Sequence, residues 1–308
     1  MAIKSVQLKN FLIFKDELSI DFEDGINVII GENGVGKTTI LKVIYSAFYR
    51  YFSGIVNDSE KECFIPYDDE KQISSYRNAT TEISVIGNTQ NTEAVFIPTT
   101  EMLSHSKGLL ALNQKYKLPF DDTQIDIIVN ASLPETREIP SNLEGILEKI
   151  SKTIDGTVVM EDDTFYVVKS DGKKIEFSLE AEGLRKLGLI WKLIRNGLLE
   201  EGSVLLWDEP EANLNPELYP LVADILIELQ KNGVQIFVAT HSYNFAKYLE
   251  IRNESNKVFI YNIYKDENGK VCSKRSSRMD DLRDSKIMKA DMELLDEIYK
   301  GLMGDLND

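Results

Sequence analysis

The chain has 308 residues, of which 43% are hydrophobic and 28% charged, a composition typical of a folded globular protein. Its 51 acidic residues outnumber its 35 lysines and arginines, so the net charge is -16 and the overall field repels a polyanion such as nucleic acid. Any contact with DNA or RNA is therefore expected to be local or to be supplied by a partner protein.

The cysteines and the N-terminal sequence bear on whether the protein is cytoplasmic, exported or inserted in a membrane. Cys63 and Cys272 are the only cysteines and lack metal-ligand spacing, so neither a disulfide nor a zinc site is expected. The first ten residues contain no apolar signal core, and no stretch approaches the roughly 18 uninterrupted apolar residues of a membrane span. We expect a cytoplasmic protein that does not associate with a membrane.

The first elements predicted along the chain are strands followed by a helix. Residues 3–8 and 18–22 alternate apolar and polar positions, which predicts two half-buried strands of an antiparallel pair. Residues 26–30 are almost uniformly apolar and predict a buried strand. The apolar spacing over residues 37–51 predicts a helix with one buried face. The order is therefore strand, loop, helix.

The middle of the chain changes character. Residues 53–80 are polar and irregular and are interpreted as an exposed insertion. Strand-like runs return at 82–86 and 94–97. A helical region interrupted by three prolines is predicted over 101–153.

Strands and helices alternate in the last predicted part. Residues 157–177 predict a β meander, and 179–199 predict a helix. A buried strand at 204–207, a helix at 216–231 and a second buried strand at 234–239 follow. This alternation predicts an α/β fold with a parallel sheet.

Residues 31–38 read GENGVGKT and link the predicted strand to the predicted helix. Glycines in such a loop let backbone amides approach phosphate groups, Lys37 reaches the β and γ phosphates, and Thr38 offers a hydroxyl to magnesium. We therefore predict a site for ATP and Mg²⁺. The residues expected to bind the nucleotide are Asn33, Gly34, Val35, Gly36, Lys37, Thr38 and Thr39. The alternative is a simple glycine-rich turn, which does not explain why the loop lies between a buried strand and a helix.

Two adjacent carboxylates follow the predicted buried strand at 204–207. Open α/β sheets bind ligands at the carboxyl ends of their strands, which is where Asp208 and Glu209 lie. Asp208 is expected to hold magnesium, and Glu209 to polarise the attacking water. By themselves these residues are equally compatible with an exposed acidic turn, but the phosphate-binding loop favours the catalytic interpretation.

His241 is one of only two histidines and follows the strand predicted at 234–239. Strands of a parallel sheet end at a common edge, so the imidazole is expected beside the γ phosphate as a third catalytic group with Glu209 and Lys37. The alternative is a histidine that caps a helix or is merely packed.

These motifs together resemble the ABC ATPase superfamily, and specifically its soluble branch of SMC, RecF and OLD-like proteins. The segments that carry the resemblance are 8–11 (LKNF), 208–216 (DEPEANLNP) and 239–242 (ATHS). The resemblance implies a single ABC-type head over residues 1–308. Its expected parts are an N-terminal lobe with antiparallel β structure and the phosphate loop at 1–100, a helical insertion at 101–153, and a C-terminal lobe at 154–308.

The resemblance also implies a signature motif that a second subunit presents to the γ phosphate. The segment EAEGLRK at 180–186 occupies the corresponding place, with Gly183 as the closely packed glycine at a helix start. Ala181 stands where the family usually has serine, which removes one hydrogen bond worth roughly 1.5 to 3 kcal/mol to a charged acceptor. The contact is expected to be weaker or to use Arg185 or Lys186. An ordinary amphipathic helix is the alternative.

The family's Q-loop glutamine is missing after the strand at 94–97, where the sequence continues Pro-Thr-Thr-Glu. Glu101 either takes the place of the glutamine near magnesium or is an acidic residue in the first turn of the next helix, where the helix dipole favours it. Residues 99–108 resemble segments of OLD-like ATPases from bacterial defence and mobile-element systems. A basic cluster of Lys274, Arg275 and Arg278 is interpreted as solvated surface rather than a DNA site.

The resemblance implies an ATPase that forms a homodimer or higher oligomer on binding ATP. No catalytic constellation is recognised after the ATPase motifs, so we expect a sensor or regulator of a separate effector, such as a Toprim or HNH nuclease, in phage defence or DNA transactions. The alternative is the nucleotide-binding subunit of a transporter, which the missing glutamine and altered signature disfavour. An SMC-like clamp is disfavoured because no long heptad segment is present.

Overall fold

The computed structural model describes residues 2–49, 64–68, 73–77, 80–89, 92–137, 139–282 and 285–304. Cys63 lies outside these residues, as does most of the insertion expected at 53–80, whereas Cys272 is half-buried with a free thiol. Within the described ranges, no helix has the length and apolar character that crossing a membrane requires.

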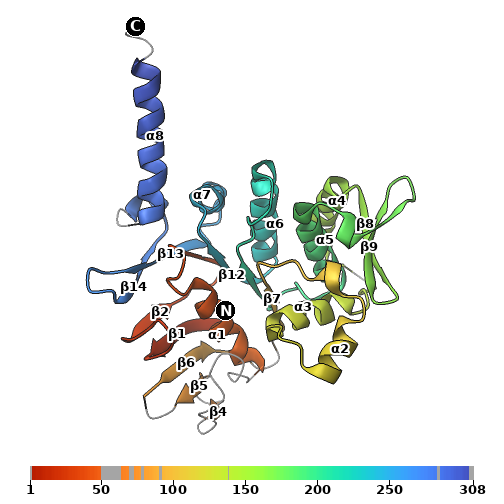
Figure 1. Cartoon of the computed structure of the whole chain (residues 1–308), viewed down its shortest axis with the longest axis horizontal. Helices are drawn as coiled ribbons and strands as arrows, with labels where there is room; N and C mark the ends of the chain where they lie inside the picture. The colour runs from red at the N-terminus through yellow and green to blue at the C-terminus, as the bar shows by residue number, and fades with distance from the viewer. Residues whose placement is uncertain are drawn as a thin grey trace.

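A six-stranded sheet forms the centre of the molecule, in the order β14-β13-β3-β12-β11-β7 (Figure 1). Its strands are β3 (Ile26–Ile30), β7 (Ala94–Ile97), β11 (Val204–Asp208), β12 (Gln235–Thr240), β13 (Val258–Lys265) and β14 (Val271–Ser276). All neighbours pair in parallel except the edge strand β14. The predicted α/β fold with a parallel core sheet is therefore confirmed, while β13 and β14 had not been predicted.

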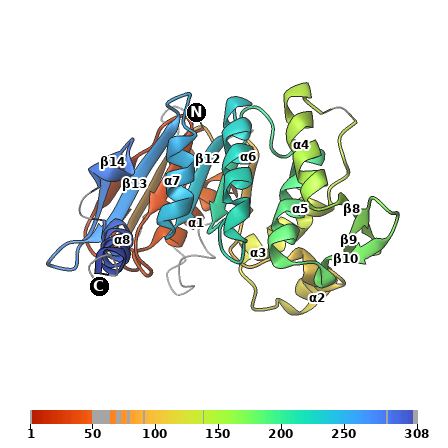
Figure 2. The same ribbon diagram turned by 90° about the horizontal axis from the view of Figure 1, so that it is seen from above.

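The two faces of this sheet contribute to separate cores, which explains the continuous apolar runs. Along β3, Val28 and Ile30 join one core and Ile29 joins the other. The first core includes side chains from α3 (Asp122–Ser132), α4 (Ser141–Thr153), α5 (Glu182–Arg195), α6 (Tyr219–Lys231) and α7 (Tyr243–Ile251). The second is formed with α1 (Lys37–Tyr49) and the N-terminal sheet. Figure 2 shows α7, α6, α5 and α4 side by side along one face.

The N-terminal sheet is antiparallel, in the order β2-β1-β6-β5-β4. Its strands are β1 (Ile3–Lys9), β2 (Leu18–Asp21), β4 (Phe64–Asp68), β5 (Ile73–Arg77) and β6 (Glu82–Gly87). The pairing of the first two strands is as predicted, with Val6 opposite Ile20. The irregular conformation expected for 53–80 is wrong for β4 and β5. β5 pairs with β6, with Tyr76 opposite Ile83, and β4 pairs with β5; this pairing makes up for the weak apolar pattern of the two strands.

The segment expected to be helical contains η1 (Leu103–His105), α2 (Leu109–Tyr116), α3 and α4. It is followed by a small antiparallel sheet of β8 (Gly156–Glu161), β9 (Thr164–Lys169) and β10 (Lys174–Glu176), which confirms the predicted meander. The short helices η2 (Phe177–Leu179), η3 (Pro216–Leu218) and η4 (Met279–Asp281) connect longer elements. The last helix, α8 (Lys286–Gly304), extends away from the body and had not been predicted (Figure 1).

Candidate active site

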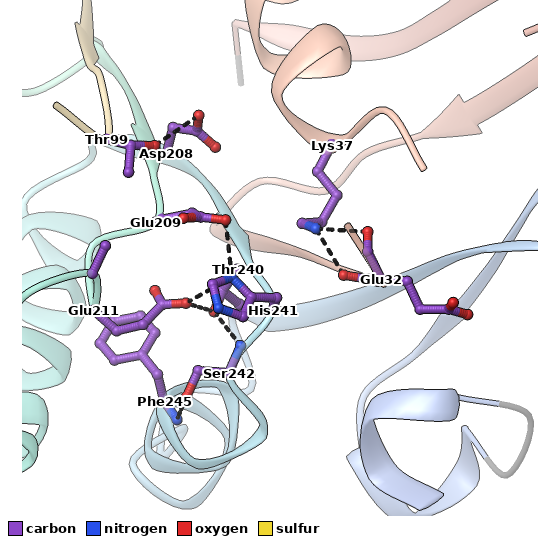
Figure 3. A network of polar contacts seen from close by, with 12 residues as sticks. Glu32, Lys37, Thr99, Asp208, Glu209, Glu211, Thr240, His241, Ser242 and Phe245 are labelled. Atoms are coloured by element: carbon purple, nitrogen blue, oxygen red, sulfur yellow. Dashed lines mark hydrogen bonds and ion pairs between the residues drawn. The ribbon is translucent and has the colours of Figure 1, made fainter. Parts of the chain in front are cut away.

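Four neighbouring strands end at one edge of the central sheet and bring their C-terminal residues together. The phosphate loop follows β3, Thr99 follows β7, Asp208 and Glu209 close β11, and His241 follows β12. These parallel strands share one direction, so their carboxyl ends form a single polar region, which Figure 3 shows from close by.

The loop at 31–36 has the backbone that its glycines allow. Gly34 and Gly36 have φ angles of 76° and 95°, in the left-handed region that favours glycine. A Cβ on Gly36 would lie 2.5 Å from Cζ of Phe14 and 2.8 Å from Cδ1 of Ile13. The side chains of the predicted nucleotide-binding positions differ in exposure: Asn33 is exposed, Val35 is buried, and Thr39 is half-buried at the start of α1.

Lys37 is buried, and its side chain curls back into the loop. Its Nζ donates hydrogen bonds to the carbonyl oxygens of Gly31, at 2.7 Å, and Glu32, at 3.0 Å. Burial lowers the pKa of Lys37, and the nearby carboxylates of Glu209 and Asp208 oppose part of that shift. An ammonium held at the mouth of a loop of backbone amides suits binding of a polyphosphate.

Asp208 is held by two threonine hydroxyls. Thr38 Oγ1 lies 3.1 Å from Oδ1 and 2.9 Å from Oδ2, and Thr99 Oγ1 donates to Oδ2 at 3.1 Å. Burial raises the pKa of Asp208, while the hydrogen bonds from Thr38 and Thr99 lower it. A carboxylate beside a hydroxyl is an oxygen donor set that fits Mg²⁺.

Glu209 and His241 form a pair beside this carboxylate. Nδ1 of His241 lies 2.9 Å from Oε1 of Glu209, and Figure 3 shows the two side chains pointing toward each other. Glu209 has a φ of 49°, a left-handed conformation that is uncommon outside glycine. Its backbone N donates to the carbonyl oxygen of Ala239 at 2.8 Å, which ties the end of β11 to β12. Both residues lie at the predicted edge of the sheet, while their direct contact had not been predicted.

Glu211 is a site residue that the sequence analysis missed. Its buried carboxylate accepts a hydrogen bond from the Thr240 hydroxyl, which in turn accepts one from the backbone N of Ser242 at 2.9 Å. Burial raises the pKa of Glu211. This chain of hydrogen bonds braces the turn that carries His241. The third acidic residue within 208–211 was the available signal.

Glu101 precedes η1, so it lies outside the first turn of that helix but binds its backbone. Its Oε1 accepts hydrogen bonds from the backbone N of Leu103, at 2.6 Å, and of Ser104, at 3.3 Å, at the start of η1. Its Oε2 lies 3.0 Å from a guanidinium nitrogen of Arg185. Thr99, rather than Glu101, contacts Asp208. The expectation that Glu101 replaces the glutamine near magnesium is thus corrected, because Arg185 and the η1 backbone already occupy its carboxylate.

Gly183 lies in the first turn of α5, as expected. A Cβ there would lie 3.1 Å from Cδ1 of Leu214 and 3.3 Å from the carbonyl oxygen of Asn213, so the helix start packs closely on the loop after β11. Ala181 is the N-cap residue and provides no side-chain cap hydrogen bond.

The two basic residues of this segment have partners inside the chain. Arg185 is paired with Glu101. Lys186 is buried, and its Nζ donates to the carbonyl oxygens of Glu209, at 3.2 Å, and Ala212, at 2.6 Å. Both cations are thus held by acceptors of their own chain, and a contact of either one with a second subunit's phosphate stays a prediction.

The sequence of the chain matches a known protein family. A family model described as "AAA domain" matches residues 5–183, which is more than half of the chain. The chain belongs to this AAA-domain family. The matched range includes the phosphate loop and ends at Gly183, so the carboxylates at 208–211 of this AAA-domain chain lie beyond it.

Two individual proteins are similar to parts of the chain. RecF, a DNA replication and repair protein of Bacillus cytotoxicus, is 51% identical over 45 residues, which is 15% of this chain and only 12% of RecF. The arginine transport ATP-binding protein ArtP of Haemophilus influenzae is 25% identical over 235 residues, covering 75% of this chain and 77% of ArtP.

A crystal structure of an SMC head, bound to the C-winged helix domain of ScpA, superposes with a TM-score of 0.55 at 15% identity. The superposition covers 92% of this AAA-domain chain and all of the SMC head chain, so the ABC-ATPase head fold is confirmed. The sequence matches agree with the branch that includes SMC and RecF proteins.

The basic cluster on β14 is largely neutralised within the AAA-domain chain. Arg275 forms an ion pair with Glu23 and lies over the ring of Phe259, and Arg278 lies 3.3 Å from Asp280. These pairs agree with its interpretation as ordinary surface.

Replacing Lys186 with methionine is expected to slow ATP turnover about 10- to 100-fold while ATP binding is retained, because a buried charged hydrogen bond of about 1.5 to 3 kcal/mol is lost. The ammonium holds the carbonyl group of Glu209, whose left-handed backbone aims the carboxylate. Turnover and nucleotide affinity are measured separately. Lys192→Met, on the same helix but paired with Glu135, is the control. Unchanged turnover in the Lys186 variant would refute this role.

Proposed function

We propose that the chain binds ATP with magnesium at this sheet edge and hydrolyses it. The observation that carries the proposal is the adjacency of three groups: Lys37 in the phosphate loop, Asp208 hydrogen-bonded to Thr38, and Glu209 in contact with His241. Thr38 and Asp208 would hold the ion. When bound, magnesium supplies positive charge that offsets the charge of the phosphates.

The remaining groups have distinct tasks in this proposal. The ammonium of Lys37 binds the β and γ phosphates, and the loop amides bind further phosphate oxygens. Glu209 orients a water molecule and accepts its proton as the oxygen attacks the γ phosphorus and the bond to the bridging oxygen breaks. His241 holds the Glu209 carboxylate and faces the cleaved phosphate. ADP and phosphate are the products.

We further propose that ATP closes two copies face to face, so that Gly183 at the α5 start of one copy meets the γ phosphate of the other. The support is the resemblance to ABC ATPases and the suitability of a helix N-terminus for an anion. Light scattering with and without ATP tests this step. A mass that stays that of a monomer at saturating ATP would contradict it.

The biological role proposed for this cycle is regulation of a separate effector, namely a nuclease in phage defence or DNA transactions. Closure on ATP and release on hydrolysis would time the effector's activity, because a ligand shifts a conformational equilibrium only through its different affinity for the two states. The likeness to RecF and the OLD-like segment at 99–108 support this role. Purification of the chain from the native host tests this role. If no nuclease and no nucleic acid co-purify with it, the role is contradicted. In that case DNA is also expected to leave the ATPase rate unchanged.

A transporter subunit is the second candidate, because the similarity to ArtP extends over most of that protein. In that case the chain would fractionate with membranes through a permease partner. Fractionation of a host lysate separates the two candidates, since the effector hypothesis predicts recovery without membranes.

A further inference from the structure

Thr99 is placed by the register of the central sheet. β7 and β11 are parallel neighbours, and Ile97 pairs with Trp207 immediately before Asp208. The chain leaving β7 therefore passes the metal-binding carboxylate proposed above. Of the residues that follow β7, Thr99 is half-buried with its hydroxyl on Asp208, whereas Thr100 is exposed.

The carboxylate of Asp208 accepts hydrogen bonds from two different segments of the chain. Oδ2 accepts a hydrogen bond from Thr99 at 3.1 Å and from Thr38 at 2.9 Å, and these donors come from β7 and from α1. The side chain of Asp208 is buried, where an ionised carboxylate requires hydrogen-bond donors. Both donors must therefore be present for one orientation of this carboxylate to be fixed.

The segment that carries Thr99 is also anchored on its other side. Two residues further on, Glu101 binds the backbone of η1 and pairs with Arg185 of α5. The Glu101 side chain is only 3% exposed, so this anchor is shielded from water. Thr99 is therefore held in place between β7 and α5, which limits how far its hydroxyl can move from Asp208.

We propose that Thr99 is a positioning residue for magnesium, because its hydroxyl holds Oδ2 of Asp208 in the orientation that binds the ion. Hydrogen bonds to a ligating carboxylate orient it and affect metal affinity. Thr99 then performs, at the end of β7, the task for which the sequence offers no glutamine. This inference rests on the proposed ATP and magnesium site.

The test uses the full chain and a fluorescent ATP analogue, whose affinity is measured in excess EDTA and during a magnesium titration. Thr99→Val keeps the shape of the side chain but removes the donor. It is expected to raise the half-saturating magnesium concentration about 10- to 100-fold and to leave affinity in EDTA unchanged. Thr99→Ser should restore the wild-type value. Thr100→Val, next to it in sequence but exposed, should behave as wild type.

The outcomes separate this inference from the proposed function. A wild-type magnesium response that Thr99→Val leaves intact would overturn the role of Thr99 alone. Nucleotide binding by the wild type that ignores magnesium would overturn the proposed site and this inference together. Thermal unfolding verifies that each variant is folded, and Thr99→Ala replaces Thr99→Val if valine is not tolerated.

Discussion

Glu209→Gln is expected to slow ATP hydrolysis by about 10²- to 10⁴-fold while leaving ATP binding intact, since that is the usual contribution of a general base. Glutamine has the size of glutamate and can still contact His241, which lies 2.9 Å from the carboxylate in the wild type. It cannot accept the proton of the attacking water. Single-turnover release of phosphate measures the chemical step directly.

This variant should also accumulate as an ATP-bound dimer, because hydrolysis no longer releases the closed state. Light scattering in ATP and magnesium detects that species. Glu217→Gln is the matched control, since Glu217 is an exposed carboxylate shortly after the same strand. Turnover of the Glu209 variant within a few-fold of the control would mean that another group activates the water.

Lys37→Met is expected to weaken ATP binding by about 100-fold or more, because each hydrogen bond from an ammonium to a charged acceptor contributes about 1.5 to 3 kcal/mol. The methionine has similar length but no charge. It also leaves the carbonyl oxygens of Gly31 and Glu32 without their donor. Isothermal titration with ATP and magnesium measures the affinity.

The control for Lys37 is Lys42→Met, on the same helix, whose ammonium pairs with Asp121 at 2.7 Å, away from the phosphate loop. Thermal unfolding of both variants shows whether the loop has lost its fold. An affinity for ATP that survives in the folded Lys37 variant would place the phosphates elsewhere.

The parts of the fold that could be predicted are those in which local pattern and tertiary role coincide. The strands at 26–30 and 204–208 are buried on both faces, so their apolar runs are continuous and easily recognised. β13 was not predicted, although Val258–Lys265 is rich in aromatic and β-branched residues. β5 is defined by its pairing with β6 and β4 by its pairing with β5, which a local pattern does not report.

In the candidate site, too, some features follow from local pattern and others depend on long-range contacts. Strand-end geometry was enough to predict Glu209 and His241 at one edge of the sheet, because parallel strands end together, but their direct contact was not predicted. Spacing alone did not decide between the two roles of Glu101, because the answer depends on Arg185, which is 84 positions away.

The intrachain partners of Arg185 and Lys186 could not be predicted for a related reason. A basic pair at a helix start looks exposed in sequence, yet the helix turns both residues toward partners within the chain. Lys186 binds the carbonyl oxygens of Glu209 and Ala212, and neither bond follows from residue type. Long-range contacts of this kind depend on how the helix packs, which the sequence pattern does not specify.

ATP hydrolysis is proposed for the sheet edge at which the phosphate loop, Asp208 and Glu209 lie. Phosphate release from ATP by the purified chain, compared between wild type and Glu209→Gln with and without magnesium, tests it most directly. Phosphate release by the wild type is expected to require both magnesium and Glu209. Release that is equal in the two proteins, or absent from the wild type, would contradict it.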